Sequence, residues 1–326
     1  MRLYASSTCL LAIVVLTACG QRVAVDNSED LKGTGGVSRT GKRVYKHALR
    51  SEAEVKKQSL RRAASAIERL GVTLHRDAEG RPEILFCHGK PITNSLRELA
   101  QLTTLKKLDL NSTGLSDMGV EYLKPLKQLE ELNLSSNRMS GKGLPAVATI
   151  TSLTDLRLDS LALSDADLGH LKPLEKLQSL SLNGNPITDA GLAHLDGLTN
   201  LKNLELSGTN VTDRGLQHLT RHRLLVRLNL FGDNITDAGL QSITNFPNLE
   251  ILILASTKVT DAGLATLKNQ TSLTELWLSE TAVTDAGLES LSGLKNLKTL
   301  YLAGSKVTEQ GVMKLKAAIP AATIMK

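Results

Sequence analysis

The chain has 326 residues, of which 39 are basic and 33 acidic, and this gives a formal net charge of +6. The excess is local, because residues 20–80 hold 13 lysines and arginines against 8 aspartates and glutamates, whereas residues 81–326 hold 25 of each. The long C-terminal part is therefore neutral, and we expect no nucleic-acid partner.

The N-terminus carries a short apolar run over residues 10–16, followed by Leu16-Thr17-Ala18-Cys19. The run is too short to span a bilayer and has the layout of a secretion signal. Its end resembles the lipobox of bacterial lipoproteins. The resemblance implies a signal peptide over residues 1–18 and a mature chain that starts at Cys19, which is diacylated on sulfur and acylated again on its new N-terminus. An ordinary signal peptide with a chance cysteine is the alternative.

The same resemblance implies a location in the bacterial cell envelope, with the chain held by its acyl chains, palmitate among them, and the folded part outside the cytoplasm. Several acyl chains on one residue give stable anchoring, since each buried methylene contributes about 0.8 kcal/mol. In a bacterium with two membranes, Gly20 directly after the cysteine favours the outer membrane.

Residues 19–50 are polar and contain Gly33-Thr34-Gly35-Gly36, which predicts a flexible tether. A basic stretch lies within it, formed by Arg39, Lys42, Arg43 and Lys46. We interpret this stretch as solvated linker, with contact to anionic lipid headgroups as the alternative.

Residues 51–80 predict a helix followed by a hairpin. Ser51 is a suitable N-cap with Glu54 at the capping-box position, and Gly71 ends the helix. Residues 72–75 and 83–86 have strand character and flank a turn at residues 77–80. Together these elements would cover the apolar end of the first coil, as a repeat array requires. The helix carries an apolar stripe formed by Val55, Leu60, Ala63, Ala64, Ile67 and Leu70.

From residue 81 onward a 24-residue pattern recurs. Residues 81–104 form a degenerate first coil, nine full repeats follow, and residues 321–326 begin a tenth. Each repeat combines alternating leucines, typical of a short strand, with leucines at helical spacing. One repeat cannot bury both faces alone, so the copies must stack strand on strand and helix on helix. The full repeats start at Leu105, Leu129, Leu153, Leu177, Leu201, Leu225, Leu249, Leu273 and Leu297.

The pattern LxxLxLxxNxI, seen as Leu177, Leu180, Leu182, Asn185 and Ile187, resembles the leucine-rich repeat, and the following TDAGL resembles a subclass common in bacterial and cysteine-containing repeats. The resemblance implies an α/β solenoid over residues 81–326, horseshoe-shaped, with a parallel concave sheet and convex helices. It indicates the fold and says little about function.

Polar residues recur at fixed positions of the repeat. A Thr-Asp pair precedes each helical leucine pair, and we interpret the pair as helix caps rather than as a metal or catalytic row. Asn137 and Asn185, replaced elsewhere by Thr or Ser, would bond turn backbone, and Leu161 and Asp233 interrupt that column. A glycine column would permit close packing at the helix start. The acidic column is Asp117, Asp165, Asp189, Asp213, Asp237, Asp261, Asp285 and Glu309.

No pattern supports catalysis, a cofactor or a metal. Cys87 stands at a core position, and without Cys9 and Cys19 it has no disulfide partner. His170, His194 and His218 share one position in successive repeats, but adjacent helices are too widely spaced for three zinc contacts unless the side chains converge. Catalytic and phosphate-binding motifs are absent from the sequence. We therefore predict a chain that is not an enzyme.

The concave face is the remaining candidate. Counting each first leucine as position 1, position 5 is polar or charged in its first six members and apolar or aromatic in its last four. We hypothesise a protein-binding patch centred on Ile253, Trp277 and Tyr301, with Phe231 and Ile251 beside it. The column reads Asp109, Asn133, Arg157, Ser181, Glu205, Asn229, Ile253, Trp277, Tyr301 and Met325.

Arg157 and Glu205 would orient the partner. Four alternatives stay open. The apolar residues could stabilise the last strands only, or they could mediate weak self-association at the C-terminal edge. The chain could also be a cell-envelope glycan binder or a purely structural lipoprotein. The sequence thus predicts a membrane-anchored, non-catalytic protein-interaction scaffold.

Overall fold

The computed structural model describes residues 15–16, 22–23 and 39–326, with side chains described from residue 52 onward. The chain forms two compact units, Met1–Val55 and Lys56–Lys326. The predicted lipidation site Cys19 and most of the predicted signal peptide and tether lie outside the described residues. No helix in the described part of the chain combines the length and the apolar character that crossing a bilayer requires.

The predicted start of the first helix was wrong. Helix α1 covers Arg39–Glu68, so it begins 12 residues before Ser51, which lies inside the helix and is not its N-cap. Residues 39–50 contain no proline and only one glycine, Gly41, and lysine, arginine, alanine and leucine all favour helix. The tether predicted for residues 19–50 is therefore helical from residue 39.

The other end of α1 behaves as predicted. Ala63, Ala64 and Ile67 are buried against the core of the repeat unit. The predicted hairpin is confirmed: β3 (Thr73–Arg76) pairs antiparallel with β4 (Pro82–Phe86). In the turn between them, Asp77 accepts hydrogen bonds from the backbone N–H groups of Glu79 and Arg81. Because β4 also pairs in parallel with the next strand, the hairpin joins directly to the repeat sheet.

The repeats build one sheet of 12 strands, ordered β14 to β3 in sequence order and parallel from β4 to β14. From β5 onward each strand pairs with the next at a register of 24 residues, as in Arg227 beside Ile251, whereas β4 pairs with β5 at a register of 23. The strand predicted to begin a tenth repeat is present as β14. The repeat strands are β5 (Lys107–Asp109), β6 (Glu131–Asn133), β7 (Asp155–Arg157), β8 (Ser179–Ser181), β9 (Asn203–Glu205), β10 (Arg227–Asn229), β11 (Ile251–Ile253), β12 (Glu275–Trp277), β13 (Thr299–Tyr301) and β14 (Thr323–Met325).

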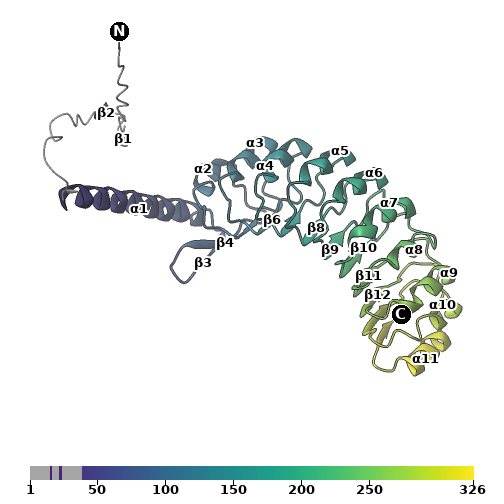
Figure 1. Ribbon diagram of the computed structural model, residues 1–326. Coiled ribbons are helices and arrows are strands. Elements are labelled where there is room, and N and C mark those ends of the chain that lie inside the picture. Colours follow the sequence, from purple (N-terminus) through teal and green to yellow (C-terminus); the bar gives the residue numbers. More distant parts are fainter. Residues whose placement is uncertain (1–14, 17–21, 24–38) are drawn as a thin grey trace, which may run out of the picture. The chain divides into compact units, whose positions relative to one another are not determined.

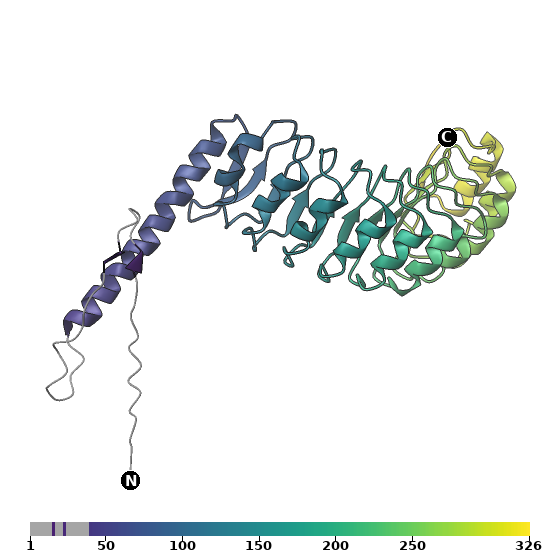
Figure 2. The same ribbon diagram turned by 90° about the horizontal axis from the view of Figure 1, so that it is seen from above.

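Helices lie on the other side of each coil. In the repeat unit the strands line the inner side of a curved stack and the helices its outer side (Figure 1), and the view from above shows the helices following one another along the stack (Figure 2). The α-helices are α2 (Leu96–Leu99), α3 (Asp117–Val120), α4 (Leu144–Val147), α5 (Asp165–Leu168), α6 (Asp189–Leu192), α7 (Asp213–His218), α8 (Leu240–Ile243), α9 (Asp261–Leu264), α10 (Asp285–Glu289) and α11 (Glu309–Ala318).

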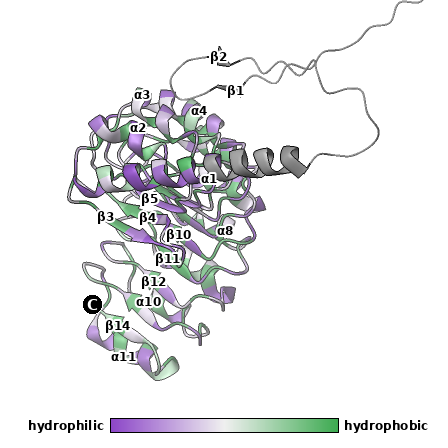
Figure 3. Cartoon of the chain, turned by 90° about the vertical axis from the view of Figure 1, so that its left-hand side faces the viewer, coloured by the Kyte–Doolittle hydropathy of each residue, from purple (hydrophilic) through white to green (hydrophobic). Residues whose placement is uncertain are grey.

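Short 3-10 turns precede or continue several of these helices. They are η1 (Thr93–Ser95), η2 (Glu121–Leu123), η3 (Gly141–Gly143), η4 (Gly169–Leu171), η5 (Ala193–Leu195), η6 (Leu219–Arg221) and η7 (Ala265–Asn269). The core between sheet and helices consists mainly of the repeated leucines, and Leu180, Leu192 and Leu198 are fully buried. Hydrophobic and hydrophilic residues alternate within the coils (Figure 3).

The Thr-Asp pair links neighbouring coils. Thr188 caps helix α6, since its hydroxyl oxygen accepts the N–H of Ala190. Its N–H and hydroxyl donate to the two carboxylate oxygens of Asp165 in the preceding repeat, over 2.7 and 2.6 Å. The threonine part of the predicted cap is thus confirmed, whereas the aspartate bonds the next coil instead of its own helix. The same pair of bonds recurs at Asp117, Asp189, Asp213, Asp237, Asp261 and Asp285.

This link explains the glycine column. A Cβ atom on Gly191 would lie 2.5 Å from Oδ1 of Asp165 and 2.7 Å from a methyl carbon of Ile187. The aspartate that reaches across from the previous coil therefore fills the space that a side chain would need. Close packing at the helix start was predicted, and the inter-coil carboxylate is its cause.

The asparagine column bonds turn backbone as predicted. Asn185 donates to the carbonyl oxygens of Leu158 and Leu182 and accepts the N–H groups of Leu161 and Leu163. The column is interrupted at Leu161. The turn there has two residues in the left-handed region, Ser160 at φ 54° and Ala162 at φ 55°, with Leu161 between them. The local irregularity expected there is present.

Candidate functional site

The concave face of the sheet carries the side chains that alternate away from the leucine core. Position 5 forms a continuous row, because parallel register places Ile253 beside Trp277, Trp277 beside Tyr301, and Tyr301 beside Met325. The structure therefore brings together the residues that were predicted to form the centre of a patch. Their exposure differs from one to the next.

An aromatic pair dominates the C-terminal part of this face. The rings of Trp277 and Tyr301 stack with centroids 3.8 Å apart and planes inclined by 28°. The indole Nε1 of Trp277 donates to a carboxylate oxygen of Glu275 at 2.5 Å. Stacking covers one face of each ring, and both residues are half-buried.

Ile253 requires a correction. Strand alternation predicted an open side chain, yet only 6% of this residue is exposed. It lies between Asn229 and Trp277 in the row, and large neighbours on a concave surface cover a branched aliphatic side chain. Ile253 thus lies beside Trp277 in the row and offers little surface to a partner.

The accessible apolar surface lies around this pair. Phe231, which follows β10, and Met325 on the last strand are each 47% exposed. Ile251 is half-buried and lies two positions before the row on β11, between Arg227 and Glu275. These side chains, rather than Ile253, are available for contact.

The polar centre of the face is internally paired. Glu205 accepts hydrogen bonds from Nε of Arg227 at 2.5 Å and from Nδ2 of Asn229 at 2.7 Å. Its carboxylate therefore already accepts two hydrogen bonds from within the chain. Arg157 is exposed on β7 and is separated from Glu205 by strand β8, so the two predicted orienting residues belong to different parts of the face.

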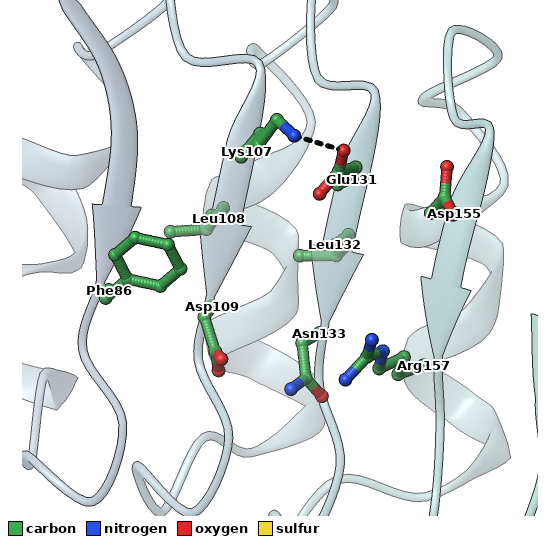
Figure 4. Close-up of a pocket in the computed structure, with 9 residues that line it drawn as sticks. All are labelled: Phe86, Lys107, Leu108, Asp109, Glu131, Leu132, Asn133, Asp155 and Arg157. Atoms are coloured by element: carbon green, nitrogen blue, oxygen red, sulfur yellow. Dashed lines mark ion pairs between the residues drawn. The ribbon is translucent and has the colours of Figure 1, made fainter. Parts of the chain in front are cut away.

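Arg157 belongs to a hollow at the N-terminal end of the concave face (Figure 4). Its volume is about 160 Å³. Lys107 and Glu131 form an ion pair across it at 2.5 Å, and the hydrogen bond that Lys107 donates to Glu131 raises the pKa of Lys107. The hollow is lined by Phe86, Lys107, Leu108, Asp109, Glu131, Leu132, Asn133, Asp155 and Arg157.

The sequence interpretation missed this hollow because Phe86 belongs to the degenerate first coil. Phe86 is 43% exposed and pairs in register with Asp109, so it is a member of the position-5 row. Aligning the first coil at Cys87 would have placed Phe86 in that row. The concave face therefore has the exposed Phe86 at its N-terminal end, the half-buried aromatic pair toward its C-terminal end and mainly polar residues between them.

Reactive groups elsewhere are buried or dispersed. Cys87 is fully buried, and burial raises the pKa of its thiol to about 12, as expected for a core residue. His170 and His218 are exposed and His194 is half-exposed. Among the residues that the structure describes, no three His, Cys, Asp or Glu side chains converge as metal ligands would.

One buried histidine was not singled out from the sequence. His222 is fully buried, with Nδ1 3.2 Å from the carbonyl oxygen of Leu219 and Nε2 3.1 Å from that of Leu195. Desolvation lowers its pKa, although the two carbonyl contacts oppose that effect. It occupies a position where most other repeats have leucine, isoleucine or phenylalanine, and that departure was the available signal. It joins two coils and lies away from the concave face.

Comparison with known proteins agrees with this architecture. A family model described as "Leucine Rich repeats (2 copies)" matches residues 175–218, and one described as "Leucine Rich repeat" matches residues 101–124, 127–148 and 269–292. No curated protein matches the chain. Four segments of the chain thus match leucine-rich repeat models, and the chain has the α/β solenoid fold that its repeats predicted.

Two solved structures from Listeria monocytogenes have a similar fold. An internalin (inlF) is 21% identical, with a TM-score of 0.50 over 74% of this chain and 86% of that one. An internalin C2 (inlC2) is 24% identical, with a TM-score of 0.50 over 66% of this chain and 84% of that one. At identities below 25%, these matches show a shared fold and nothing more.

Proposed function

We propose that this protein is a non-catalytic scaffold that binds a protein partner on its concave face and is held in a bacterial cell envelope by lipidated Cys19. The observation that carries the binding proposal is the placement of exposed aromatic and apolar side chains on an otherwise polar inner surface. With aromatic residues only 2% of the sequence, Phe86, Phe231, Trp277 and Tyr301 all lie on or beside this face. Aromatic residues are favoured anchors in protein interfaces.

A protein partner fits the geometry of the aromatic pair better than a glycan does. Sugar rings pack on the open faces of aromatic side chains, whereas Trp277 and Tyr301 each have one ring face covered by the other at 3.8 Å. Phe231 and Met325, each 47% exposed, add apolar surface to the same face, which suits apolar side chains of a protein. Envelope glycan binding therefore stays the second candidate.

The binding proposal is tested by photo-crosslinking in native membranes. A photo-reactive amino acid replaces Phe231 on the concave face in one variant and Met313 on helix α11 in another, since these residues are 47% and 65% exposed. We expect a discrete protein adduct from position 231 only. Equal adducts from both positions, or none from either, would refute a concave partner site.

A second variant separates binding from folding. Phe231→Glu places a charge at an exposed position of the concave face, and Met313→Glu is the matched control on α11. The first should lower partner recovery at least about tenfold, because burying an unpaired carboxylate in an interface costs more than about 1.4 kcal/mol. Binding of wild-type protein to isolated envelope polysaccharide, without a protein adduct, would favour the glycan reading.

The anchor has its own test. Cys19→Ala removes the residue that we propose to be acylated. On cell fractionation the variant should move from the membrane fraction to the soluble fraction, and in metabolic labelling with radioactive palmitate it should carry no label. Label that persists in the variant would exclude Cys19 as the lipidation site.

A further inference from the structure

A buried carboxyl group closes the turn that carries Phe231. The turn runs from Leu230 to Asp233, because the N–H of Asp233 donates to the carbonyl oxygen of Leu230 over 3.2 Å. Gly232, at the third position, has a positive φ of 75°, which such a turn requires. Phe231 occupies the second position and is 47% exposed, whereas Asp233 is 2% exposed. The proposed contact residue and a buried titratable group thus share one turn.

Asp233 also joins this turn to the one before it. Its Oδ1 accepts the N–H of Thr209 at 2.7 Å and the Thr209 hydroxyl at 3.0 Å. A further bond runs from the N–H of Gly208 to the carbonyl oxygen of Phe231 at 2.8 Å. The position of Phe231 therefore depends on a junction between two stacked turns in which Asp233 accepts two hydrogen bonds.

The second carboxylate oxygen, Oδ2, takes the place of an amide nitrogen. In the turn two repeats earlier, Oδ1 of Asn185 accepts the N–H of Leu161. Oδ1 of Asp233 accepts the N–H of Thr209 in the same way. Nδ2 of Asn185 donates to two carbonyl oxygens at 2.9 and 2.8 Å, whereas Oδ2 of Asp233 is buried and has no hydrogen-bond partner among the described residues. An acceptor therefore stands where the repeat has a donor.

Protonation restores the missing donor. A protonated carboxyl group has an O–H that donates to a carbonyl oxygen, as the amide of Asn185 does. By the 24-residue register, the carbonyl oxygens equivalent to those that Asn185 contacts belong to Leu206 and Leu230. Each of them accepts one backbone N–H in its turn at 3.2 Å, which leaves a second lone pair for the O–H. An ionised Asp233 instead faces these oxygens with a negative charge.

Few charged groups surround Asp233. Its own turn, residues 230–235, and the turns stacked on either side, residues 206–211 and 254–259, contain one other charged residue, Lys258. Lys258 is exposed. Within these three turns no buried cation therefore compensates for a charge on the carboxyl group.

Burial raises the pKa of Asp233 to about 6, and the two hydrogen bonds from Thr209 oppose this effect. The charged residues on the strands that enter the turns, Glu205 and Arg227, are already paired with each other at 2.5 Å. Asp233 thus gains and loses its proton between about pH 5 and pH 7, whereas an exposed aspartate is mostly ionised above about pH 5.

We infer that protonation of Asp233 regulates the proposed partner site by locking the turn that presents Phe231. The protonated carboxyl group donates to one of the two carbonyl oxygens and holds the stacked turns together, as Asn185 does in its own turn. The ionised group cannot donate, and the turn opens more often. Partner binding through Phe231 is therefore stronger in mild acid than at alkaline pH. The inference rests on the proposed concave site and adds its regulation.

The closed turn favours the protonated carboxyl group. The pKa of Asp233 is about 6 in the closed turn and has the ordinary value of 3.8 where the turn is open. The contribution to the closed form is therefore complete below pH 3.8 and is lost as pH rises through about 6. From pH 5 to pH 8 the ratio of open to closed turn should rise about tenfold, because one pKa unit corresponds to a factor of about ten.

Hydrogen exchange tests the turn without any partner. Peptides from residues 206–211 and 230–236 are followed in the full chain at pH 5 and pH 8, and each rate is corrected for the intrinsic exchange rate. Protection in Asp233→Asn divided by protection in the wild type should rise about tenfold between the two pH values, since an amide does not titrate. The ratio cancels the effect of His222, whose lowered pKa acts on both proteins alike.

Two further variants separate this carboxyl group from any other. Asn185→Asp moves the same group into a turn that lacks it, so the turn at residues 182–187 should acquire the pH dependence seen at residues 230–236. Asn210→Asp adds a carboxylate at an exposed position of the turn at residues 206–211 and should leave protection as in the wild type. Circular dichroism verifies that both variants fold.

Partner binding is measured by the adduct that a photo-reactive residue at position 231 forms. The adduct yield in the otherwise wild-type chain, relative to that in Asp233→Asn, should be up to about tenfold lower at pH 8 than at pH 5. Dividing by the variant cancels any titration of the partner itself. Asn210→Asp should give the wild-type yield at both pH values.

An exchange ratio that is the same at pH 5 and pH 8 would overturn the inference. An adduct ratio that stays constant while the exchange ratio changes would overturn it as well, because the turn would then move without affecting the partner. No adduct at position 231 at either pH would refute the partner site itself, whereas the exchange ratio would still decide whether Asp233 controls the turn.

Discussion

Asp233 shows how a single residue departs from the repeat. It occupies the column in which Asn185 donates to the carbonyl oxygens of Leu158 and Leu182. A carboxylate has no N–H to donate, so Asp233 only accepts, from the N–H and hydroxyl of Thr209 at 2.7 and 3.0 Å, and its second oxygen has no partner among the described residues. With 2% of the residue exposed, burial raises its pKa to about 6.

Replacing Asp233 by asparagine should therefore stabilise the protein at high pH. The folded pKa lies above the unfolded value, so the contribution of Asp233 is fully present below pH 3.8 and is lost as pH rises through about 6. The rise from 3.8 to about 6 corresponds to about 3 kcal/mol at 1.36 kcal/mol per unit. Urea unfolding of Asp233→Asn at pH 8 should show most of this gain.

The same variant should differ little from wild type at pH 4, where Asp233 is protonated in the folded state. Asp196→Asn, at a half-exposed position, serves as the control and should have a small effect at both pH values. A gain for Asp233→Asn that is the same at pH 4 and pH 8 would contradict the assigned cause.

Cys87 provides a probe at the same scale. Its thiol is fully buried with a pKa near 12, so a thiol reagent should modify it only when the first coil opens. In a chain from residue 20 onward, where Cys87 is the only cysteine, the modification rate at pH 7.5 should rise with urea in parallel with unfolding. Rapid modification of the folded protein would place Cys87 in an accessible pocket instead.

At the scale of the element, the aspartate that joins successive coils decides what the helix start tolerates. Alanine is ordinarily favoured over glycine in a helix by about 1 kcal/mol. At Gly191, however, the added carbon would lie 2.5 Å from the Asp165 carboxylate, which is already bonded to Thr188. The tertiary contact therefore opposes the local preference.

Gly191→Ala should accordingly lower the free energy of unfolding by about 1 to 3 kcal/mol, the usual cost of overpacking. Gly197→Ala is the matched control, because its added carbon meets nothing within 4 Å. The control should be neutral within about 0.5 kcal/mol. Thermal or urea unfolding measures both, and equal effects would show that the inter-coil carboxylate is not the constraint.

At the scale of the whole repeat unit, each coil contacts only its neighbours, so the stability of one coil depends on the coils beside it. The first coil has no preceding repeat, and the end of α1 covers it with Ala63, Ala64 and Ile67. Loss of this cover should therefore lower the local stability of the coils at β4 and β5 and have little effect at β12 and β13.

Ile67→Ala is expected to cost about 2 to 5 kcal/mol in the coils it covers, because it leaves a cavity at a fully buried site. Hydrogen exchange should accelerate in β4 to β6 and stay unchanged in β11 to β13. Val55→Ala, on the same helix but 64% exposed, should leave exchange unchanged throughout the repeats. Uniform acceleration would indicate that the repeats unfold as a single cooperative unit.

The sequence by itself determined the repeat frame, because a 24-residue period with two internal spacings admits one kind of packing. It therefore predicted the parallel sheet, the core leucines, the capping threonines and the buried Cys87. It also placed Trp277 and Tyr301 on the concave face, since alternation along a strand fixes which side chains leave the core.

The tertiary structure decided what lies between repeats. Contacts 22 to 24 residues apart, such as Asp165 with Thr188, Glu205 with Arg227, and the Trp277–Tyr301 stack, depend on side-chain reach across neighbouring strands and coils. Contacts of this kind cover Ile253, engage Glu205 and place Phe86 on the concave face. A repeat pattern describes each coil by itself, and exposure on a concave surface is set by the coils on either side.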